Sequence, residues 1–346
     1  MYLLSPHKKQ FRANLHCHST RSDGRLSPEE LKQAYQNRGY QILAITDHEA
    51  PKNHTALSEE NFLLLTGYEA YIRPDPHCGY NIFAPEIHLN LFARDPQNER
   101  IVCFNPYYCK YISEEEKDSL QKVGSQRVRE YTVDYINEFI QTARDHGYLV
   151  SYNHPVWSME AEERILAYEG IFSMELVNGS AMVENNLEYS GPLYQKMLQA
   201  GKRIFVHSSD DNHNKFPFHD PQCESFVGAT MILADALQYD AVIGAMEAGE
   251  MYSTMGPTFS EVSFDGETVH VECSNVRVIS CRFGSCKKVL RVCAAEGETV
   301  CSADFKLHPK ARYVQISIMD SRGRYADTRG YFRDELGLEP LAEREP

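Results

Sequence analysis

The stretch FRANLHCHSTRSDG, residues 11–24, joins a short apolar run to a loop that carries several metal-capable side chains. We predict that residues 11–19 form a strand that runs into this loop. Residues i and i+2 of a strand point to the same side, so His16 and His18 can reach one ion while Cys17 faces the interior. Asp23 follows in the same loop. A solvated loop with a few histidines is the alternative, and the rest of the chain has to decide between the two.

Composition and charge limit the class of protein. The chain has 346 residues, 42% hydrophobic and 24% charged, which fits a globular protein of one large or two smaller domains. Its net charge of −14 repels a phosphate backbone, so we expect no long nucleic acid as a partner. There is no apolar run of the about 20 residues that a membrane helix needs, and no signal peptide is recognisable. We therefore expect no membrane contact and a cytoplasmic location, where the ten cysteines would be reduced thiols.

Strands and helices alternate along most of the chain. The segment 26–40 is a predicted helix with Ser27 as N-cap, Pro28 at the first position and Glu30 completing a capping box. A second, amphipathic helix is predicted over 132–147. Strands are expected in ILAI (42–45), NFLLLTGYEA (61–70), EIHLNLFA (86–93), YLVSYNHP (148–155), IFSMELVNG (171–179) and RIFVHSSDDNH (203–213). This alternation predicts parallel βα units, with a site at the carboxyl ends of the strands of a barrel-like sheet.

The pattern changes after Gly256 and Pro257 to short alternating strands separated by turn residues. These strands predict a small antiparallel β-sandwich. We therefore predict two domains, residues 1–257 and residues 258–346, and the sequence does not indicate what the second one does. Within the first domain, the long polar segment 95–128 is expected to be an insertion or lid near the mouth of the site.

Metal-capable side chains gather at the predicted strand ends. Six of the fourteen histidines lie there, interleaved with carboxylates, and both groups bind first-row divalent metals. The candidate ligands are His16, His18, Asp23, His48, Glu69, His88, His154, Asp211 and His213. Nine ligands are too many for one ion. We expect two or three divalent metal ions that share bridging carboxylates, an arrangement suited to the hydrolysis of phosphate esters.

The motifs HCHSTRSDG, LAITDH, GYEA, HLNLF, NHP and DDNH occur in this order over about residues 11–255. Together they resemble the motifs of the PHP (polymerase and histidinol phosphatase) family of metal-dependent phosphoesterases. The resemblance implies an α/β fold, a distorted (β/α)7 barrel, and a site of two or three metal ions. The C-terminal region is similar to a small antiparallel β-sandwich that is attached to some members.

The same resemblance implies how the ligands are shared among Mn, Fe or Zn ions, with Mg also compatible. One ion would be held by His16, His18, Glu69 and Asp211. A second would be held by Glu69, His88 and His154, so that Glu69 bridges the two. The third would be held by Asp23, His48 and His213. Some members have histidine where this chain has Asp23, and a carboxylate there favours a harder metal than zinc.

Residues beside these motifs have roles that the sequence leaves open. Asp47 precedes His48 and is a candidate for orienting a ligand or transferring a proton, with capping of the strand end as the alternative. Asn178, Arg21 and Lys215 are candidates for contacting the substrate. The alternatives are a loop cap for Asn178 and surface solvation for the two cations.

Three further features allow competing interpretations. His77 competes with His88 as a ligand, and Trp157 either packs in the interior or forms a pocket wall. Five cysteines lie between Cys273 and Cys301. Their spacing fits no usual zinc motif, so thiols of a β core are the preferred interpretation over structural zinc.

The sequence thus predicts a hydrolase of a small phosphorylated substrate, such as a nucleotide or a sugar phosphate. Metal ions would activate a hydroxide that attacks phosphorus. Two alternatives stay open. The same hydroxide could attack an amide or lactone carbonyl, or the protein could bind metal and ligand without catalysis.

Overall fold

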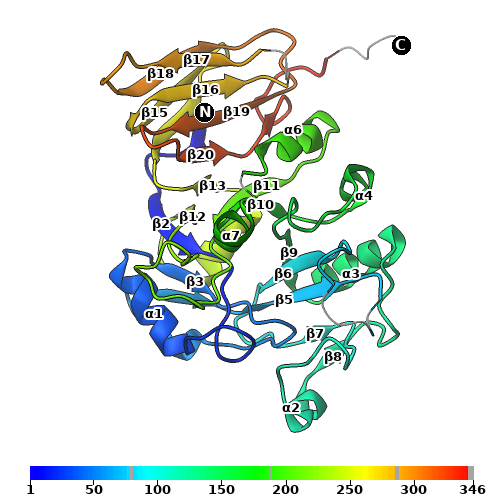
Figure 1. Ribbon diagram of the computed structural model, residues 1–346. Helices are drawn as coiled ribbons and strands as arrows, with labels where there is room; N and C mark the ends of the chain where they lie inside the picture. The colour runs from blue at the N-terminus through cyan, green and yellow to red at the C-terminus, as the bar shows by residue number, and fades with distance from the viewer. Residues whose placement is uncertain (76, 78–80, 188, 285–287, 342–346) are drawn as a thin grey trace.

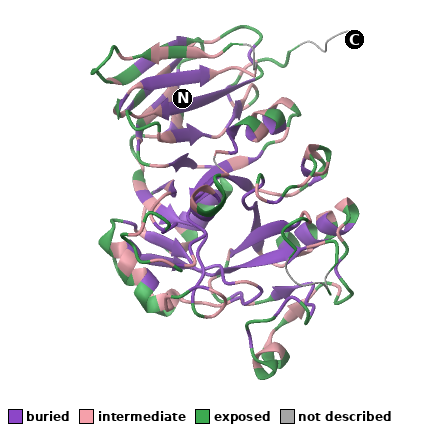
Figure 2. Cartoon of the chain, in the orientation of Figure 1, coloured by how far each residue is buried: buried purple, intermediate pink, exposed green. Residues whose placement is uncertain are grey.

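A computed structural model of the chain describes residues 1–341 apart from 76, 78–80, 188 and 285–287. The described strands form a five-stranded and a ten-stranded sheet around the predicted metal ligands, and a four-stranded antiparallel sheet that packs on the C-terminal part of the ten-stranded one (Figure 1). A short parallel pair, β7 (Ile101–Val102) and β8 (Lys122–Val123), forms a fourth sheet. The strands are mostly buried, and the exposed residues lie mainly on loops and on the outer faces of helices (Figure 2). No helix among the described residues combines the length and the apolar character needed to cross a membrane.

A five-stranded sheet forms one side of the N-terminal part. Its order is β11 (Phe205–Ser209), β10 (Ser173–Asn178), β9 (Tyr148–Tyr152), β6 (Ile87–Ala93) and β5 (Gly67–Ile72). Strands β9, β10 and β11 are parallel, whereas β6 runs antiparallel to both of its neighbours. The prediction of uniformly parallel strands is therefore wrong for β6. The segment 61–70 also forms two strands in different sheets, because β4 (Leu63–Leu65) ends before β5 begins.

A ten-stranded sheet forms the other side and continues into the C-terminal part. Its order is β17 (Leu290–Cys293), β16 (Val278–Arg282), β19 (Tyr313–Met319), β20 (Tyr325–Thr328), β13 (Met251–Thr254), β12 (Ala229–Ala234), β2 (Lys9–Asn14), β3 (Ile42–Ala44) and β4, with β21 (Tyr331–Phe332) paired to β19. Strands β2, β3 and β4 are parallel. Because β13 pairs with β20, the sheet crosses residue 257 without interruption. The domain boundary at that position stays a prediction.

These two sheets approach each other without forming one continuous ladder among the described residues. Neither the pair β4 and β5 nor the pair β11 and β12 is joined as neighbouring strands. Isolated bridges instead join Cys17 to Asn212, His48 to Glu69, and Lys52 to Gly67. The N-terminal part is thus a mixed α/β structure whose hydrogen-bonded ladder stays open at both junctions.

Helices such as α1 (Pro28–Asn37) and α3 (Val133–Asp145) lie against the outer faces of these sheets, whereas α2 (Glu114–Ser119) projects away from them (Figure 1). The other helices are α4 (Glu162–Ala167), α5 (Gly179–Asn185), α6 (Gly191–Gln199) and α7 (Tyr239–Glu247), with a 3-10 turn η1 (Thr55–Leu57). The predicted capping box of α1 is confirmed, since Ser27 and Glu30 bond reciprocally to each other's backbone. Helix α3 buries Ile136, Phe139 and Ile140 on one face, as its sequence pattern predicts.

The C-terminal part is antiparallel throughout, as expected. A four-stranded sheet of order β1 (Tyr2–Leu4), β14 (Phe259–Phe264), β15 (Thr268–Val276) and β18 (Val300–Lys306) shares a buried core with strands of the ten-stranded sheet. Val262 and Val271 pack in this core with Ile279 and Ile316. The sequence did not predict that β1, from the start of the chain, pairs with β14.

Candidate metal centre

The candidate ligands reach one pocket from the ends of both N-terminal sheets. Two ligands do not lie at the end of a strand: Glu69 is the third residue of β5, which corrects its predicted place at a strand end, and His88 lies near the beginning of β6. Since β6 runs antiparallel to β5 and β9, its beginning lies at the edge where those strands end. His88 pairs with Tyr71 of β5, and its carbonyl accepts a hydrogen bond from Asn153, just after β9. The reversed strand therefore brings His88 to the same edge.

Four buried side chains form an inner cluster: His16, His18, Glu69 and Asp211. The Nε2 atoms of His16 and His18 lie 3.2 Å apart. Asp211 Oδ1 is 3.1 Å from His16 Nε2 and 3.0 Å from His18 Nε2, and Glu69 Oε1 is 3.2 Å from His16 Nε2. Two nitrogens bound to one tetrahedral ion at about 2.0–2.1 Å would be about 3.3–3.4 Å apart. The spacing in the inner cluster therefore suits donors that share a cation.

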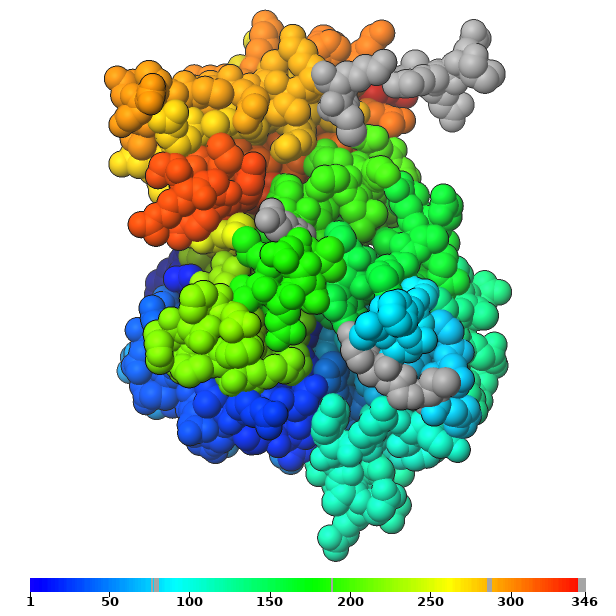
Figure 3. Space-filling view, viewed as in Figure 1, coloured from blue at the N-terminus to red at the C-terminus, as the bar shows by residue number. Residues whose placement is uncertain are grey.

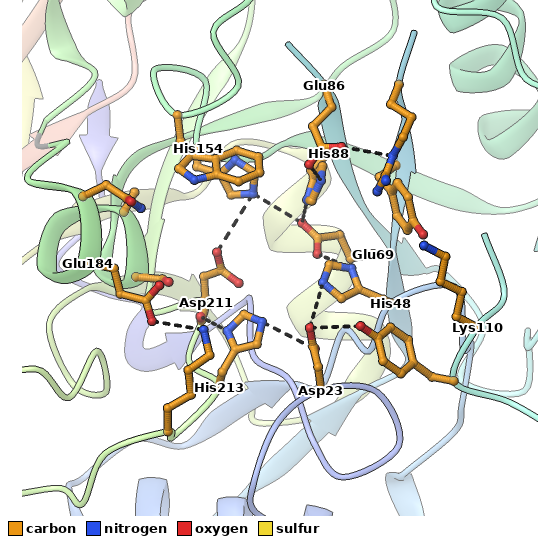
Figure 4. A pocket seen from close by; sticks show the side chains of 18 residues that line it. Asp23, His48, Glu69, Glu86, His88, Lys110, His154, Glu184, Asp211 and His213 are labelled. Carbon is orange, nitrogen blue, oxygen red and sulfur yellow. Dashed lines mark hydrogen bonds and ion pairs between the residues drawn. The ribbon is translucent and has the colours of Figure 1, made fainter. Parts of the chain in front are cut away.

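Glu69 also faces the histidines on its other side (Figure 4). His88 Nδ1 lies 3.1 Å and His154 Nε2 3.5 Å from Glu69 Oε1, and His48 Nδ1 lies 2.9 Å from Glu69 Oε2. A carboxylate flanked by donors on both sides is placed to bridge two ions. His48, Glu69 and His88 have ligand atoms close enough together to hold one ion. His48 also belongs to a second such group, with Asp23 and His213.

Asp23, His48 and His213 form an outer cluster near the mouth. Asp23 Oδ1 lies 3.4 Å from His213 Nε2, and Asp23 Oδ2 lies 3.8 Å from His48 Nε2. His18 completes this group, with its Nδ1 3.8 Å from Asp23. The distances here are longer than in the inner cluster, and the Asp23 side chain is 33% exposed.

The donor set fits cations better than it fits mutual hydrogen bonds. The approach of His48 Nδ1 to Glu69 Oε2 lacks hydrogen-bond geometry, and both atoms are buried without a hydrogen-bond partner among the described residues. Buried polar atoms without partners are costly unless another group satisfies them. The backbone supports the same conclusion, since His154 and Asp211 have φ values of 26° and 52°, and strained backbone concentrates at functional sites.

The pKa shifts of Glu69 and His18 indicate that the carboxyl is ionised and the imidazole is neutral at physiological pH. Burial raises the pKa of the Glu69 carboxyl, but the surrounding histidines outweigh burial and hold the pKa well below its usual value. Burial, reinforced by His213 and His48, lowers the pKa of His18 to about 4. His18 is therefore a neutral imidazole at physiological pH, which is the form that binds a metal ion.

Residues 14–177 match the family model of the PHP domain. This part of the chain is a PHP domain. Residues 14–177 contain seven of the nine candidate ligands. The other two, Asp211 and His213, come later in the chain, and the fold brings them to the same clusters.

Short stretches of this chain are similar to parts of two curated proteins. The DNA polymerase/3'-5' exonuclease PolX of Bacillus subtilis is 37% identical over 90 residues, which cover 21% of this chain and 16% of that protein. A 5'-3' exoribonuclease of Haemophilus influenzae is 42% identical over 60 residues, which cover 16% of this chain and 22% of that protein. The chain thus matches less than a quarter of the length of either relative. The crystal structure of a two-domain protein from Bacteroides vulgatus, which contains a predicted PHP-like metal-dependent phosphoesterase, is 14% identical with a TM-score of 0.44 and covers 96% of this chain and 89% of its own.

A pocket of 380 Å³ lies over the clusters of the PHP domain. The molecular surface is hollowed where the blue N-terminal segment, the yellow-green segment and the cyan segment meet (Figure 3). The pocket-lining cations are Arg73, Lys110 and Lys215. Lys110 belongs to the segment 95–128, which therefore reaches the pocket as expected, although its role as a lid stays a prediction.

The structure separates the three predicted substrate contacts. Lys215 lines the pocket, where its Nζ lies 3.3 Å from Glu184 Oε1. Arg21 points away from the pocket and pairs with Glu116. Asn178 is buried outside the pocket lining, where its side-chain oxygen caps α5 and its Nδ2 donates to Asp211 at 3.2 Å.

Asp47 lies behind the site and does not line the pocket. Its carboxylate accepts hydrogen bonds from the Ser19 backbone at 2.7 Å, from the Ser19 hydroxyl at 2.6 Å, and from the Ser22 hydroxyl at 2.7 Å. These bonds hold the loop that carries Asp23. The contacts suit an orienting role, and the alternative of proton transfer stays a prediction.

The remaining alternatives are resolved in part by position. His77 is exposed on a loop with its ring 4.3 Å from that of Tyr107, outside the pocket. Trp157 is a pocket wall, and its ring centroid lies 4.6 Å from that of His154 and 5.2 Å from that of His88. Among the cysteines that the structure describes, no group could hold a metal ion; Cys286 lies outside the described residues.

Sequence reasoning missed Glu175, which is buried directly behind the inner cluster. Its Oε1 lies 2.9 Å from His16 Nδ1. The position of Glu175 near the end of a predicted strand was the available signal, but a residue that faces the ligands from behind has no metal-ligand spacing to reveal it.

Proposed function

We propose that this protein is a metal-dependent phosphoesterase that hydrolyses a small phosphorylated substrate. The observation that carries the proposal is the convergence of nine His, Asp and Glu side chains on one pocket, with Glu69 between several of the histidines; seven of the nine lie in the PHP domain. Divalent cations held there would lower the pKa of a bound water and neutralise charge on the phosphoryl oxygens. The allocation of two or three ions to these residues, and the closed (β/α)7 barrel that the resemblance implies, belong to the proposal.

The cations of the chain suggest how the phosphate is held. Arg73 Nε lies 3.2 Å from Glu86, and Lys215 pairs with Glu184. Lys110 has no carboxylate within 4.0 Å among the described residues, and its exposed side chain lines the pocket. A pocket-lining ammonium without an anionic partner is free to bind a phosphoryl oxygen. We assign this role to Lys110 in place of Arg21.

The leaving oxygen needs a proton from a group that faces the pocket. The Tyr111 hydroxyl meets this requirement, since it lines the pocket 3.4 Å from Asp23 Oδ2. Burial and the nearby Asp23 carboxylate raise the pKa of Tyr111 to about 12, so its proton is present at neutral pH. Tyr111 is therefore a better placed donor than Asp47.

Two alternatives remain in the same site. An amide or lactone carbonyl could be attacked in place of phosphorus, and a protein that only binds metal would use the same ligands. The net charge of −14 favours a small substrate over long nucleic acid in each case.

The test is the metal content of the purified protein by mass spectrometry, together with phosphate release from a panel of phosphomonoesters and carboxylate formation from a panel of amides and lactones. Chelation should abolish phosphate release, and re-addition of manganese should restore it. The variant His18→Ala should lose metal and turnover. His270→Ala, an exposed histidine of the C-terminal sheet, is the matched control and should change neither. Bound metal with turnover of amides or lactones alone would refute phosphoester hydrolysis, and absence of metal under all loading conditions would refute the site.

A further inference from the structure

Glu175 accepts four hydrogen bonds while remaining 1% exposed. Its Oε1 accepts from His16 Nδ1 at 2.9 Å and from the Ser209 hydroxyl. Its Oε2 accepts from the His154 backbone N–H at 2.7 Å and from Asn178 Nδ2 at 2.8 Å. Each carboxylate oxygen offers two acceptor positions, so this environment uses the whole acceptor capacity of the group.

Two of the four donors belong to candidate ligands that come from different strands. The bond to His16 Nδ1 requires a proton on that nitrogen, so in the neutral ring the lone pair is on Nε2. That Nε2 is the atom 3.2 Å from Glu69 Oε1 and 3.1 Å from Asp211 Oδ1. The bond to the His154 N–H holds the chain at the residue whose φ is 26°. Asn178 extends the contact, because the same Nδ2 that donates to Glu175 also donates to Asp211.

We infer that Glu175 is a positioning residue that fixes the tautomer and ring orientation of His16 and the backbone of His154, and so sets the affinity of the inner cluster for a divalent cation. This inference rests on the proposed function for the identity of the bound group. The hydrogen-bond arrangement itself does not depend on it. Carboxylates that orient ligating histidines commonly change metal affinity by about 10- to 100-fold when they are replaced.

Four hydrogen-bond donors face the side chain of residue 175, and only a carboxylate can accept from all four. In Glu175→Gln the amide nitrogen would face two donors, so one side of the group would be left with unpaired N–H or O–H groups. The volume of the side chain is nearly unchanged, so packing is preserved. The variant therefore separates acceptor chemistry from simple filling of space. Glu160→Gln is the matched control, because Glu160 is a buried carboxylate that accepts from Tyr152 and Tyr168 outside the pocket.

The first measurement uses metal-free, full-length wild-type protein labelled with ¹⁵N-histidine. Nuclear magnetic resonance should show a proton on His16 Nδ1, assigned with a His16→Gln variant. The Nε2–H tautomer would overturn the inference without any need for a Glu175 variant. This result does not depend on metal binding, so it is distinguishable from failure of the proposed function, which would appear as wild-type protein that binds no metal.

The second measurement is Mn²⁺ binding by calorimetry on the wild type, Glu175→Gln and Glu160→Gln. We expect one class of sites to weaken about 10- to 100-fold in Glu175→Gln, with unchanged far-ultraviolet circular dichroism, and no change in Glu160→Gln. Wild-type Mn²⁺ affinity in a folded Glu175→Gln protein would overturn the inference. If that variant does not fold, the tautomer of His16 in the wild type still decides it.

Discussion

A buried ion pair next to the candidate metal centre gives the sharpest test of how the fold supports the site. The Arg129 guanidinium is buried and contacts both oxygens of Glu49 through Nη1 and Nη2, with the Nη2 bond at 2.8 Å. It also donates to the Tyr71 carbonyl at 2.8 Å and lies 4.4 Å from the centroid of the Tyr108 ring. Glu49 directly follows His48. Because Arg129 also bonds to the carbonyl of Tyr71, which lines the pocket, the pair ties the end of β5 to the turn that carries His48.

The perturbation is Arg129→Met, which removes the cation and roughly keeps its apolar contacts. The Glu49 carboxylate would remain buried with the Tyr71 N–H as its donor. Removing one partner of a buried pair costs about 3–5 kcal/mol, because the other charge is left without compensation. Replacing both charges, in Glu49→Gln with Arg129→Met, should recover much of that loss. We therefore expect a coupling free energy of about 2 kcal/mol or more between the two positions.

The assay is urea unfolding followed by circular dichroism for the wild type, both single variants and the double variant. Arg127→Met is the control, since Arg127 lies two residues away and its exposed pair with Glu138 should contribute about 1 kcal/mol or less. A cost below about 1 kcal/mol for Arg129→Met would refute the reasoning, as would strict additivity of the two single variants.

Three further predictions test other parts of the molecule. Lys110→Ala should raise KM for a phosphomonoester about 10- to 100-fold, because a charge-assisted contact to phosphate is lost, whereas Lys122→Ala outside the pocket should have no effect in the same steady-state assay. Burial raises the pKa of the Asp327 carboxyl in the folded protein, so the folded state binds this proton more tightly than the unfolded state does. The free energy of unfolding that this proton contributes is therefore lost as pH rises above the pKa that Asp327 has in the unfolded chain. Asp327→Asn should therefore raise Tm more at about pH 7 than at about pH 4 by calorimetry; an equal shift at both would contradict the assignment. Deletion of 258–346 removes β20 and so exposes the edge of β13. The shortened protein should have a lower Tm and should aggregate in light-scattering measurements. A monomer as stable as the wild type would show that β20 is not needed to cover this edge.

Local signals in the sequence were sufficient where short-range chemistry decides the outcome. The capping box of α1 depends on Ser27 and Glu30, which lie three residues apart, and it forms as predicted. The apolar stripe of α3 is buried for the same reason, since its period is set by helix geometry. The spacing of His16 and His18 likewise placed both rings in one cluster, even though β2 ends at Asn14 before reaching them.

Strand direction and sheet membership could not be predicted from the same signals. A buried apolar strand has the same pattern in either direction, so β6 was taken as parallel although it is antiparallel to β5 and β9. The pairing of β1 with β14 joins residues more than 250 positions apart, and no local pattern encodes such a partner.

The sequence by itself determined which side chains can bind a metal, because imidazole and carboxylate groups are chemically suited to it wherever they occur. Tertiary structure alone decided that Glu69 lies between His16 and His88, and that Glu175 stands behind His16 with all of its acceptor positions occupied. It also decided that Arg21 faces Glu116 while Lys110 faces the pocket. Ligand type is a property of a residue, whereas the direction in which a side chain points depends on strands and loops that are distant in the chain.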